Sequence, residues 1–372
     1  MSGAAGDDLD PEEMDRKQRR YAYLLPMASA HFIDKVQSGS PRGSAPDAGA
    51  DATESEPVPV LLAPEWAKLD AETARERALG CMLGLAVGDA VGAAVEFKPR
   101  DSFPPLPDMI GGGPFNLRPG EWTDDTTMAL CLGDSLLALG GFDQEDFMER
   151  LRGWLERGEN TVPGRCFDIG ATTRAAIMRF AADGFAAAGS TEPMSAGNGS
   201  LARLAPLAIF CAGDHDQAEF LAVKQSRTTH GARECLDACQ LFISYLIDAL
   251  DGADKDAATR PRVMSLSPKL LFINAGEWRA KTRDQISSSG YVVNTLEAAL
   301  WSVWQTDNFR DAVLTAANLG DDADSVTAVA GQLAGALYGV SAIPAEWLAR
   351  LAWREKIETL ANSLFDQGAA DD

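Results

Sequence analysis

The chain has 372 residues, of which 46% are hydrophobic, so it is long enough to bury a sizeable core in one large domain or two ordinary ones. Its net charge of −22 argues against nucleic acid as a partner, because binding a phosphate backbone needs Lys and Arg to displace counterions. The same charge argues against an anionic membrane surface as a partner.

The N-terminal segment predicts an extension ahead of a compact domain. It opens with the acidic sequence MSGAAGDDLDPEEMD and has no hydrophobic stretch of the kind that a secretory signal contains. Residues 1–36 contain a predicted helix, PEEMDRKQRRYAYLLPMASAHFIDKV, with a charged first half and an apolar second half. Residues 38–60 are rich in Ser, Pro, Gly, Ala and acids, which predicts a flexible linker because this composition buries too little apolar surface to offset its ordering entropy. We therefore expect an extension and linker over residues 1–70 and a compact domain over residues 71–372.

The six cysteines predict buried thiols in place of disulfides. None of them forms a C-x-x-C pair, and five lie inside apolar helical patterns. We interpret them as free thiols of a reducing compartment, which together with the missing signal predicts a cytoplasmic protein.

The first strong element covers residues 78–97, which are almost entirely apolar over a membrane-spanning length. Asp89 and four glycines interrupt the stretch, so a buried helix of a soluble protein is the better interpretation. The carboxylates of Asp89 and Glu96 are costly to bury unless they are paired or coordinated. The glycines recur every four residues along one helix face, which favours close approach of another backbone: Gly80, Gly84, Gly88 and Gly92.

The rest of the domain also has a helical period, with about a dozen segments in all and no internal repeat. Alternating, strand-like runs are scarce. The sequence therefore predicts an all-α domain of many helices. The clearest segments are FDQEDFMERLRGWLERG (142–158), LARLAPLAIFCAG (201–213), RECLDACQLFISYLIDAL (233–250), NTLEAALWSVWQT (294–306) and DSVTAVAGQLAGALYGV (324–340).

Two of the predicted helices begin with bunched oxygen-bearing side chains, in GEWTDDTTMAL (120–130) and LGDDADSVTAV (319–329). Helix capping is the simplest interpretation, since Thr, Ser and Asp accept hydrogen bonds from the free amides of a first turn. Two groups of three such residues exceed what two caps require. The residues are Thr123, Asp124 and Asp125 in the first group and Asp322, Asp324 and Ser325 in the second.

Together with Glu96, these residues form a ligand set made only of oxygen atoms. Such a set selects Mg²⁺, Mn²⁺ or Ca²⁺ over Zn²⁺. Five carboxylates in one place would repel one another strongly, and two divalent cations would balance their charge. The pattern therefore predicts a site suited to two-metal chemistry.

Seven sequence blocks in order resemble the ADP-ribosylglycohydrolases, in particular the bacterial branch named for the dinitrogenase reductase-activating glycohydrolase. The resemblance spans roughly residues 76–352. It implies an all-α fold, a dinuclear Mg²⁺ or Mn²⁺ site, and hydrolysis of the N-glycosidic bond between ADP-ribose and arginine on a modified protein. The blocks are GDAVGAAVEF, EWTDDTTM, GRCFDIGATTRAAI, GNGSLARLAPLAI, RTTHG, YVVNTLEAALWSVW and NLGDDADSVTAVAGQLAGALYG.

The resemblance also implies roles for individual residues. Both oxygen-bearing groups match the family's metal ligands, and either Glu96 or Asp124 matches the carboxylate that directs the attacking water. Asp168 in FDIG is expected to face the guanidinium group of the substrate, with capping of the following helix as the alternative. Four further residues are expected to bind the diphosphate or a ribose: Asn198, Gly199, Ser200 and His230.

The extension suggests a second function. Family members that act as immunity proteins against ADP-ribosyltransferase toxins also carry an extension ahead of a complete hydrolase, so residues 1–70 predict a segment that blocks a cognate toxin or packs on its own domain. A third interpretation, a structural crystallin-type relative, conflicts with the intact ligand sets.

Overall fold

The computed structural model describes residue 66 and residues 68–368, which belong to one compact unit, Ala63–Asp372. Within this described part the regular elements are all helical, and pairing between extended segments is limited to three isolated bridges. The predicted all-α class is confirmed.

The α-helices are α2 (Ala71–Gly92), α3 (Asp124–Leu139), α4 (Gln144–Arg157), α5 (Ala171–Asp183), α6 (Gly199–Ala202), α7 (Ala205–Phe210), α8 (His215–Thr229), α9 (Arg233–Leu250), α10 (Lys255–Ala258), α11 (Pro268–Ala275), α12 (Val292–Trp304), α13 (Phe309–Ala317), α14 (Ala323–Tyr338), α15 (Ala345–Arg350) and α16 (Arg354–Gly368). The 3₁₀ helices are η1 (Pro193–Ser195), η2 (Glu277–Ala280), η3 (Arg283–Gln285) and η4 (Val340–Ala342).

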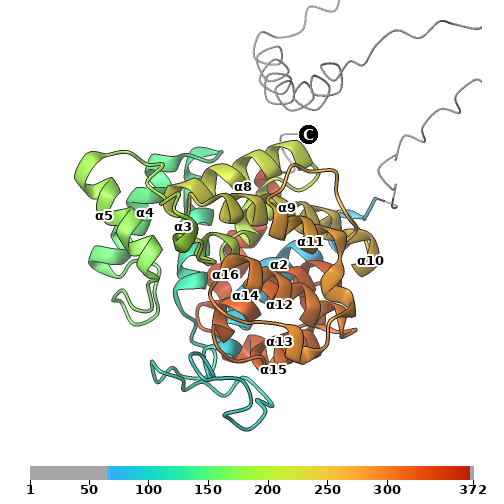
Figure 1. The fold of residues 1–372 in the computed structure, drawn as a ribbon. Helices are drawn as coiled ribbons and strands as arrows, with labels where there is room; N and C mark the ends of the chain where they lie inside the picture. Colours follow the sequence, from blue (N-terminus) through green and yellow to red (C-terminus); the bar gives the residue numbers. More distant parts are fainter. Residues whose placement is uncertain (1–65, 67, 369–372) are drawn as a thin grey trace, which may run out of the picture. The chain divides into compact units, whose positions relative to one another are not determined.

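The pair α2 and α14 has the most extensive contact between any two described helices (Figure 1). A Cβ atom added to Gly84 would lie 2.2 Å from the carbonyl oxygen of Gly331, and one added to Gly88 would lie 2.1 Å from that of Thr327. The two backbones therefore touch along the glycine stripe, as the four-residue spacing predicts. This contact fixes where the first turn of α14 lies relative to the last turn of α2.

Apart from half-buried Leu79 and exposed Phe97, the apolar stretch over residues 78–97 is buried, as expected. From Gly80 to Gly92 every residue of α2 is shielded from solvent. The helix ends at Gly92, and residues 93–97 form turns that carry Glu96 beyond the helix end. Among the described residues no helix has both the length and the apolar character that a membrane crossing requires.

The segment 201–213 differs from the single helix that its periodicity predicts. It splits into α6 and α7, with Arg203 and Leu204 between them. Pro206 explains the break, because proline has no N–H to donate to the carbonyl four residues earlier and its ring disfavours helical geometry there. That carbonyl, on Ala202, accepts a hydrogen bond of 2.6 Å from the side-chain amide of Gln332 on α14.

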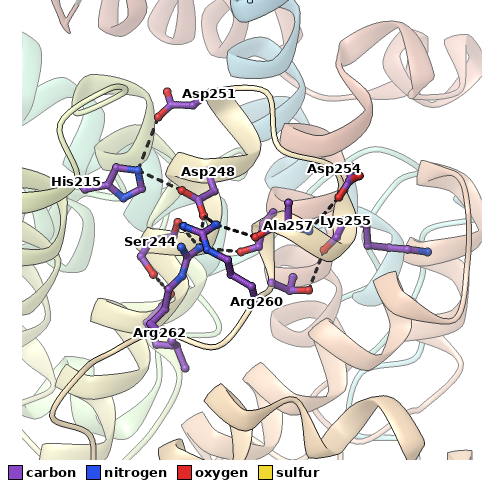
Figure 2. A network of polar contacts seen from close by, with 12 residues as sticks. His215, Ser244, Asp248, Asp251, Asp254, Lys255, Ala257, Arg260 and Arg262 are labelled. Carbon is purple, nitrogen blue, oxygen red and sulfur yellow. Dashed lines mark hydrogen bonds and ion pairs between the residues drawn. The ribbon is translucent and has the colours of Figure 1, made fainter. Parts of the chain in front are cut away.

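A polar network fastens α8 to the C-terminal end of α9 (Figure 2). The buried carboxylate of Asp248 forms ion pairs with Arg260 and Arg262 from the segment after α10. Its other oxygen lies 3.2 Å from Nε2 of His215, which is also 3.7 Å from the carboxylate of Asp251. His215 received no functional role from the sequence, and here it ties the start of α8 to the end of α9.

The cysteine prediction is confirmed for the described part of the chain, which contains all six. Each is a free thiol; five are buried and Cys166 is half-buried. Burial raises the pKa of each, including Cys131, Cys211 and Cys235, so they are neutral at physiological pH. The helix predicted in residues 1–36 and the linker predicted over residues 38–60 lie outside the described residues. The division of the chain at residue 70 stays a prediction.

Candidate metal centre

The first turns of α3 and α14 meet at one pocket, so the acids at the start of both helices belong to a single site. The Thr123 hydroxyl precedes α3 and lies 3.2 Å from a carboxylate oxygen of Asp324 in the first turn of α14. The pocket encloses about 220 Å³. Ten of the predicted site residues line it: Glu96, Asp124, Asp125, Asp168, Asn198, Gly199, His230, Asp322, Asp324 and Ser325.

The carboxylates in this pocket form two groups that share one member. Glu96, Asp322 and Asp324 make the first group, and Asp124, Asp168 and Asp324 make the second. Within each group one oxygen from each residue lies within 4.8 Å of the others. Asp324 thus stands between two sets of three carboxylates. Asp125 lines the same pocket but belongs to neither group.

The electrostatics of this cluster favour a bound cation. Burial, and then the neighbouring carboxylates of Asp324 and Asp124, raise the pKa of Glu96 to about 10. Burial, followed by repulsion from Asp324 and Glu96, raises the pKa of Asp168 to about 11. Asp124, Asp125 and Asp324 also have pKa values well above the ordinary range, with burial as the largest cause.

Several of these carboxylates have buried oxygen atoms without a hydrogen-bond donor among the described residues. An acceptor that is buried without a donor is costly, and a divalent cation would satisfy several such oxygens at once. The residues present therefore fit Mg²⁺ or Mn²⁺. The unpaired atoms are Glu96 Oε2, Asp125 Oδ2, Asp168 Oδ2 and Asp324 Oδ1.

Asp89 holds the first turn of α3 in place from α2, a role that the sequence did not reveal. Its carboxylate is fully buried and accepts hydrogen bonds from the backbone N–H groups of Thr123 (2.8 Å) and Thr126 (3.0 Å). It also accepts from the hydroxyl groups of Thr123 (2.9 Å) and Thr126 (2.6 Å). A hydroxyl of Thr123 that donates to Asp89 keeps its lone pairs for a cation.

Asp322 is positioned by its own neighbours. Its carboxylate accepts a hydrogen bond of 2.5 Å from the side-chain amide of Asn198, whose other contact is the Thr295 hydroxyl at 2.9 Å. The amide of Asn198 thus orients an acid of the cluster. Its expected contact with the diphosphate or a ribose stays a prediction. A side chain on Gly290 would crowd Asp322, since an added Cβ would lie 3.2 Å from its carboxylate.

Three non-glycine residues around the site have left-handed backbone conformations: Phe97 (φ +60°), Asp168 (φ +57°) and Asp321 (φ +57°). Such angles are unfavourable for side chains, above all for an aromatic one. The Phe97 N–H donates to the Asp321 carbonyl (2.7 Å), and the Asp321 N–H donates to the Lys98 carbonyl (2.8 Å). This reciprocal pair ties the turn that carries Glu96 to the residue before Asp322.

His230 lies in the pocket wall and is neutral, because burial lowers its pKa to about 3. Its Nδ1 is 2.8 Å from the Thr229 hydroxyl, which accepts a hydrogen bond of 2.8 Å from the buried guanidinium of Arg203. Since Arg203 supplies that donor, the hydroxyl hydrogen is directed to Nδ1, and the ring proton is assigned to Nε2. His230 therefore presents an N–H donor on its Nε2 side, which is nearest to Gly197 of the pocket.

Arg203 is the other residue that sequence reasoning missed. It is fully buried, stacks 4.9 Å above the Phe147 ring and donates to Gln225. Burial lowers its pKa only to about 10, so it remains a cation behind the acid cluster. Its place in an apolar segment between two helices was the available signal, since a charge buried there needs partners.

The remaining predicted residue, Ser200, is turned away from the pocket. Its hydroxyl lies in the core and contacts the Ser226 hydroxyl (2.9 Å) and the Cys239 thiol (3.5 Å). Gly199 does line the pocket, where an added Cβ would lie 3.2 Å from the His230 ring.

Comparison with known proteins decides the family. Residues 70–372 match the model of the family described as ADP-ribosylglycohydrolase. The chain belongs to the ADP-ribosylglycohydrolase family. It is 50% identical over 348 residues to ADP-ribosylarginine hydrolase Tri1 of Pseudomonas putida (strain GB-1), with 94% of this chain and 92% of that protein covered.

Further family members are similar over most of their length. ADP-ribosylarginine hydrolase Tri1 of Serratia proteamaculans (strain 568) is 45% identical, with 95% of this chain and 96% of that protein covered. ADP-ribosyl-[dinitrogen reductase] glycohydrolase of Rhodospirillum rubrum is 36% identical, with 74% of this chain and 90% of that protein covered. A solved structure titled ADP-ribosylglycohydrolase-related protein complex matches with a TM-score of 0.71 and 44% identity, covering 80% of this chain and 99% of that one.

Proposed function

We propose that the chain hydrolyses the N-glycosidic bond between ADP-ribose and arginine on modified proteins, and so reverses mono-ADP-ribosylation. The two carboxylate groups that share Asp324 carry the proposal, because they equip the pocket for two-metal hydrolysis. Similarity to two ADP-ribosylarginine hydrolases over more than nine-tenths of the chain supports arginine as the acceptor of the ADP-ribose.

The proposed ligands of two Mg²⁺ or Mn²⁺ ions are the residues of the two groups, supplemented by the side chains that border them. Glu96, Asp322 and Asp324 would serve one ion, and Asp124, Asp168 and Asp324 the other. When bound, the ions neutralise the acids, polarise ribose hydroxyl groups and lower the pKa of a nearby water. Thr123, Asp125 and Ser325 complete the proposed ligand set.

In the proposed reaction the water oxygen bonds to C1″ of the ribose as the bond from C1″ to the guanidine nitrogen breaks. We assign the acceptance of one water proton to Glu96, and the second proton stays on the new C1″ hydroxyl. Glu96 is the longest of the acids, lies in a turn outside α2 and has an unpaired oxygen. The electron pair of the broken bond stays on the guanidine nitrogen through an oxocarbenium-like transition state. The guanidine then takes the proton that Glu96 accepted, so arginine leaves as its guanidinium cation and Glu96 returns to a carboxylate.

Asp168 and His230 would bind the two ends of the reacting group. The left-handed backbone at Asp168 holds its carboxylate toward Asp124 and Asp324, where it can face the guanidinium and adjoin an ion at the same time. The N–H donor of His230 suits a hydroxyl or phosphate oxygen of ADP-ribose. Because the His230 pKa is far below neutral, this donor is unaffected by pH above about 4.

The choice of linkage tests this proposal. We expect Mn²⁺-loaded protein to release ADP-ribose from an arginine-modified peptide at least about 100-fold faster than from a serine-modified one, since only arginine offers a cation to Asp168. Asp168→Asn should lower the arginine activity by about the same factor and the serine activity much less, because the amide oxygen can still contact an ion whereas the charge that faces the guanidinium is lost. Faster cleavage of the serine linkage by wild type would refute the assignment of substrate, and an equal loss on both linkages in Asp168→Asn would refute the guanidinium role of Asp168.

We also propose a second function, blocking of a cognate ADP-ribosyltransferase toxin through residues 1–70. The similarity to the Pseudomonas putida protein leaves only 6% of the chain uncovered, whereas the family model begins at residue 70. The similarity to that relative therefore includes most of the extension. Cytoplasmic action, which the sequence predicts, would place both functions beside the modified targets.

Two variants separate these functions. Asp124→Ala protein is expected to inhibit the transferase in stoichiometric amounts without releasing ADP-ribose, whereas protein without residues 1–60 is expected to release ADP-ribose without inhibiting. Transferase activity and ADP-ribose release are measured for both. Equal inhibition by the truncated protein would remove the second function and leave the hydrolase standing.

A further inference from the structure

A second pocket, lined by three arginines, lies beside the metal centre and has no part in the proposed reaction. It encloses about 380 Å³ between the end of α4 and the start of α5. The two pockets share no lining residue. Arg157, Arg165 and Arg174 line it, against the single acid Glu156. This concentration of positive charge is unusual in a chain with a net charge of −22.

Two of the three arginines are available for a ligand. Arg157 is engaged by Glu159, with a contact of 2.6 Å, and lies 3.8 Å from Glu156. Arg165 and Arg174 are exposed, and neither makes a hydrogen bond or an ion pair within the described part of the chain. A pair of free guanidinium groups is suited to bind carboxylate or phosphate oxygens through paired N–H donors.

The backbone around Arg165 is fixed, so the pocket is preformed. Gly158 has a φ of +69°, and an added Cβ would lie 2.3 Å from the carbonyl carbon of Gly164 and 2.4 Å from the nitrogen of Arg165. Asn160 anchors the same loop by donating to Asp134 (2.8 Å). These contacts hold the Arg165 backbone against the end of α4.

The arginine pocket and the metal pocket are lined by consecutive residues of α5. Thr172 and Thr173 of α5 line the metal pocket, and Arg174, the next residue, lines the arginine pocket. In the chain, Phe167 lies between Arg165 of the arginine pocket and Asp168 of the metal pocket. Its ring packs edge-on against Phe115, with 5.2 Å between ring centroids, and this contact fixes the residue before Asp168. A helical turn rises 5.4 Å, and an extended peptide advances about 3.4 Å per residue.

From this placement we infer that the arginine pocket binds acidic side chains of the modified protein that lie close in sequence to the ADP-ribosylated arginine. The inference rests on the proposed function and adds sequence preference to it. Arg165 and Arg174 accept the carboxylates, while the ribose occupies the separate metal pocket. The pocket also offsets the repulsion that an acidic target would meet at this acidic protein.

Matched peptides test the inference. Each carries one ADP-ribosylated arginine, flanked two and three residues away on both sides by Glu in one peptide and by Gln in the other. Wild-type protein is expected to have a kcat/KM about tenfold higher for the Glu peptide, through a lower KM, which corresponds to about 1.4 kcal/mol. Arg165→Gln/Arg174→Gln protein should reduce this preference to less than about twofold, and Arg165→Lys/Arg174→Lys protein should keep part of it.

The control is Arg310→Gln/Arg354→Gln, which removes the same charge from surface arginines on α13 and α16 that already have partners. It should keep the preference. A preference that survives in Arg165→Gln/Arg174→Gln, or an equal loss of activity on both peptides, would overturn the inference. Weaker inhibition by free ADP-ribose in that variant would also overturn it, since the pocket would then bind the ligand's own phosphates.

Binding without hydrolysis separates this inference from the proposed function. Fluorescence anisotropy of an unmodified, labelled Glu-flanked arginine peptide should show about tenfold weaker binding to Arg165→Gln/Arg174→Gln protein than to wild type, and the difference should shrink in high salt. If wild type hydrolyses neither peptide yet this difference is found, the proposed reaction fails and the acidic-peptide site stands. If the affinities are equal, the site fails.

Discussion

At the level of single residues, Asp89 shows how a buried acid can serve a site without entering it. It accepts four hydrogen bonds from Thr123 and Thr126 and so sets the position of Asp124 and Asp125, which follow Thr123. An ordinary cap comes from a residue just before its own helix. Here the cap comes from α2, 34 positions earlier in the chain.

Asp89→Ala is therefore expected to cost much more stability than loss of an ordinary cap. Four donors would lose their acceptor in a fully buried place, which amounts to about 3–4 kcal/mol. Asp143→Ala is the control, since it removes the local, exposed cap of α4, with its 2.9 Å bond to Asp146, at about 1 kcal/mol. Urea unfolding of both variants measures the two values, and equal losses would show that Asp89 is not the anchor of α3.

The sequence predicted which residues form the site better than it predicted the hydrogen bonds between them. The clustered acids at two helix starts were visible in the sequence, because the residue types alone show which ligand atoms a site can offer. That Asn198 orients Asp322, or that Arg203 supports His230 through Thr229, depends on contacts between distant segments. Asp168 was expected to face the substrate, and its place among the acids likewise follows from packing that no local pattern encodes.

At the level of helices, the glycines of α2 let α14 approach closely, and this approach sets where the first turn of α14 lies in the pocket. Gly88→Ala places a methyl group where 2.1 Å separates it from the Thr327 carbonyl, so the helices must separate. We expect a loss of about 3 kcal/mol or more and weaker metal binding. Gly141→Ala, whose added Cβ meets nothing within 4 Å, should stay within about 0.5 kcal/mol of wild type. Thermal unfolding that ranks the two variants equally would contradict this packing.

The network around His215 predicts a pH-dependent attachment of α8. The hydrogen bond to Asp248 raises the pKa of His215 above its ordinary 6.5, despite partial burial. A raised pKa gives stability that is fully present below pH 6.5 and is lost as the pH rises through the folded-state value. His215→Gln should therefore lower the free energy of unfolding by about 0.5 kcal/mol at pH 5.5 and by almost nothing at pH 8.5. The value at pH 5.5 is reduced because the ring is partly exposed to solvent. A loss that is the same at both pH values would contradict the assignment.

The periodicity of the sequence predicted where helices form, but it did not predict where a helix is interrupted. The segment containing Arg203 keeps an apolar period across α6 and α7, so the pattern alone joins them. The break needs both Pro206 and an alternative donor for the Ala202 carbonyl, and that donor, Gln332, comes from a helix 130 positions away.

At the level of the whole molecule, the acid cluster stores protons that a metal must displace. Glu96 and Asp168 have pKa values of about 10 and 11, so the metal-free protein keeps both protonated at pH 7. Because these pKa values are raised, the metal-free fold loses stability as the pH rises from about 4 toward 10. Cations should therefore bind more tightly at higher pH, and they should stabilise the protein more there.

Binding of Mn²⁺ at pH 7 is thus expected to release protons from the cluster, because the pKa values of Glu96 and Asp168 lie above 7 in the metal-free protein. Calorimetric titration in two buffers with different ionisation enthalpies gives the number directly. A titration with no proton release would show that the acids are already ionised, and that repulsion in the cluster is relieved by another route.

The central claim is that carboxylates sharing Asp324 form a metal-dependent hydrolytic site. Its most direct test is the rate of ADP-ribose release from an arginine-modified protein, measured for wild type, Asp324→Asn and Asp321→Asn with Mn²⁺ and with excess chelator. Asp321 is the control, because it belongs to the same loop and carries the same charge but does not line the pocket. We expect release by wild type only with Mn²⁺, a loss of at least about 1,000-fold in Asp324→Asn, and a change below about threefold in Asp321→Asn. Full release in excess chelator, or by Asp324→Asn, would contradict the claim.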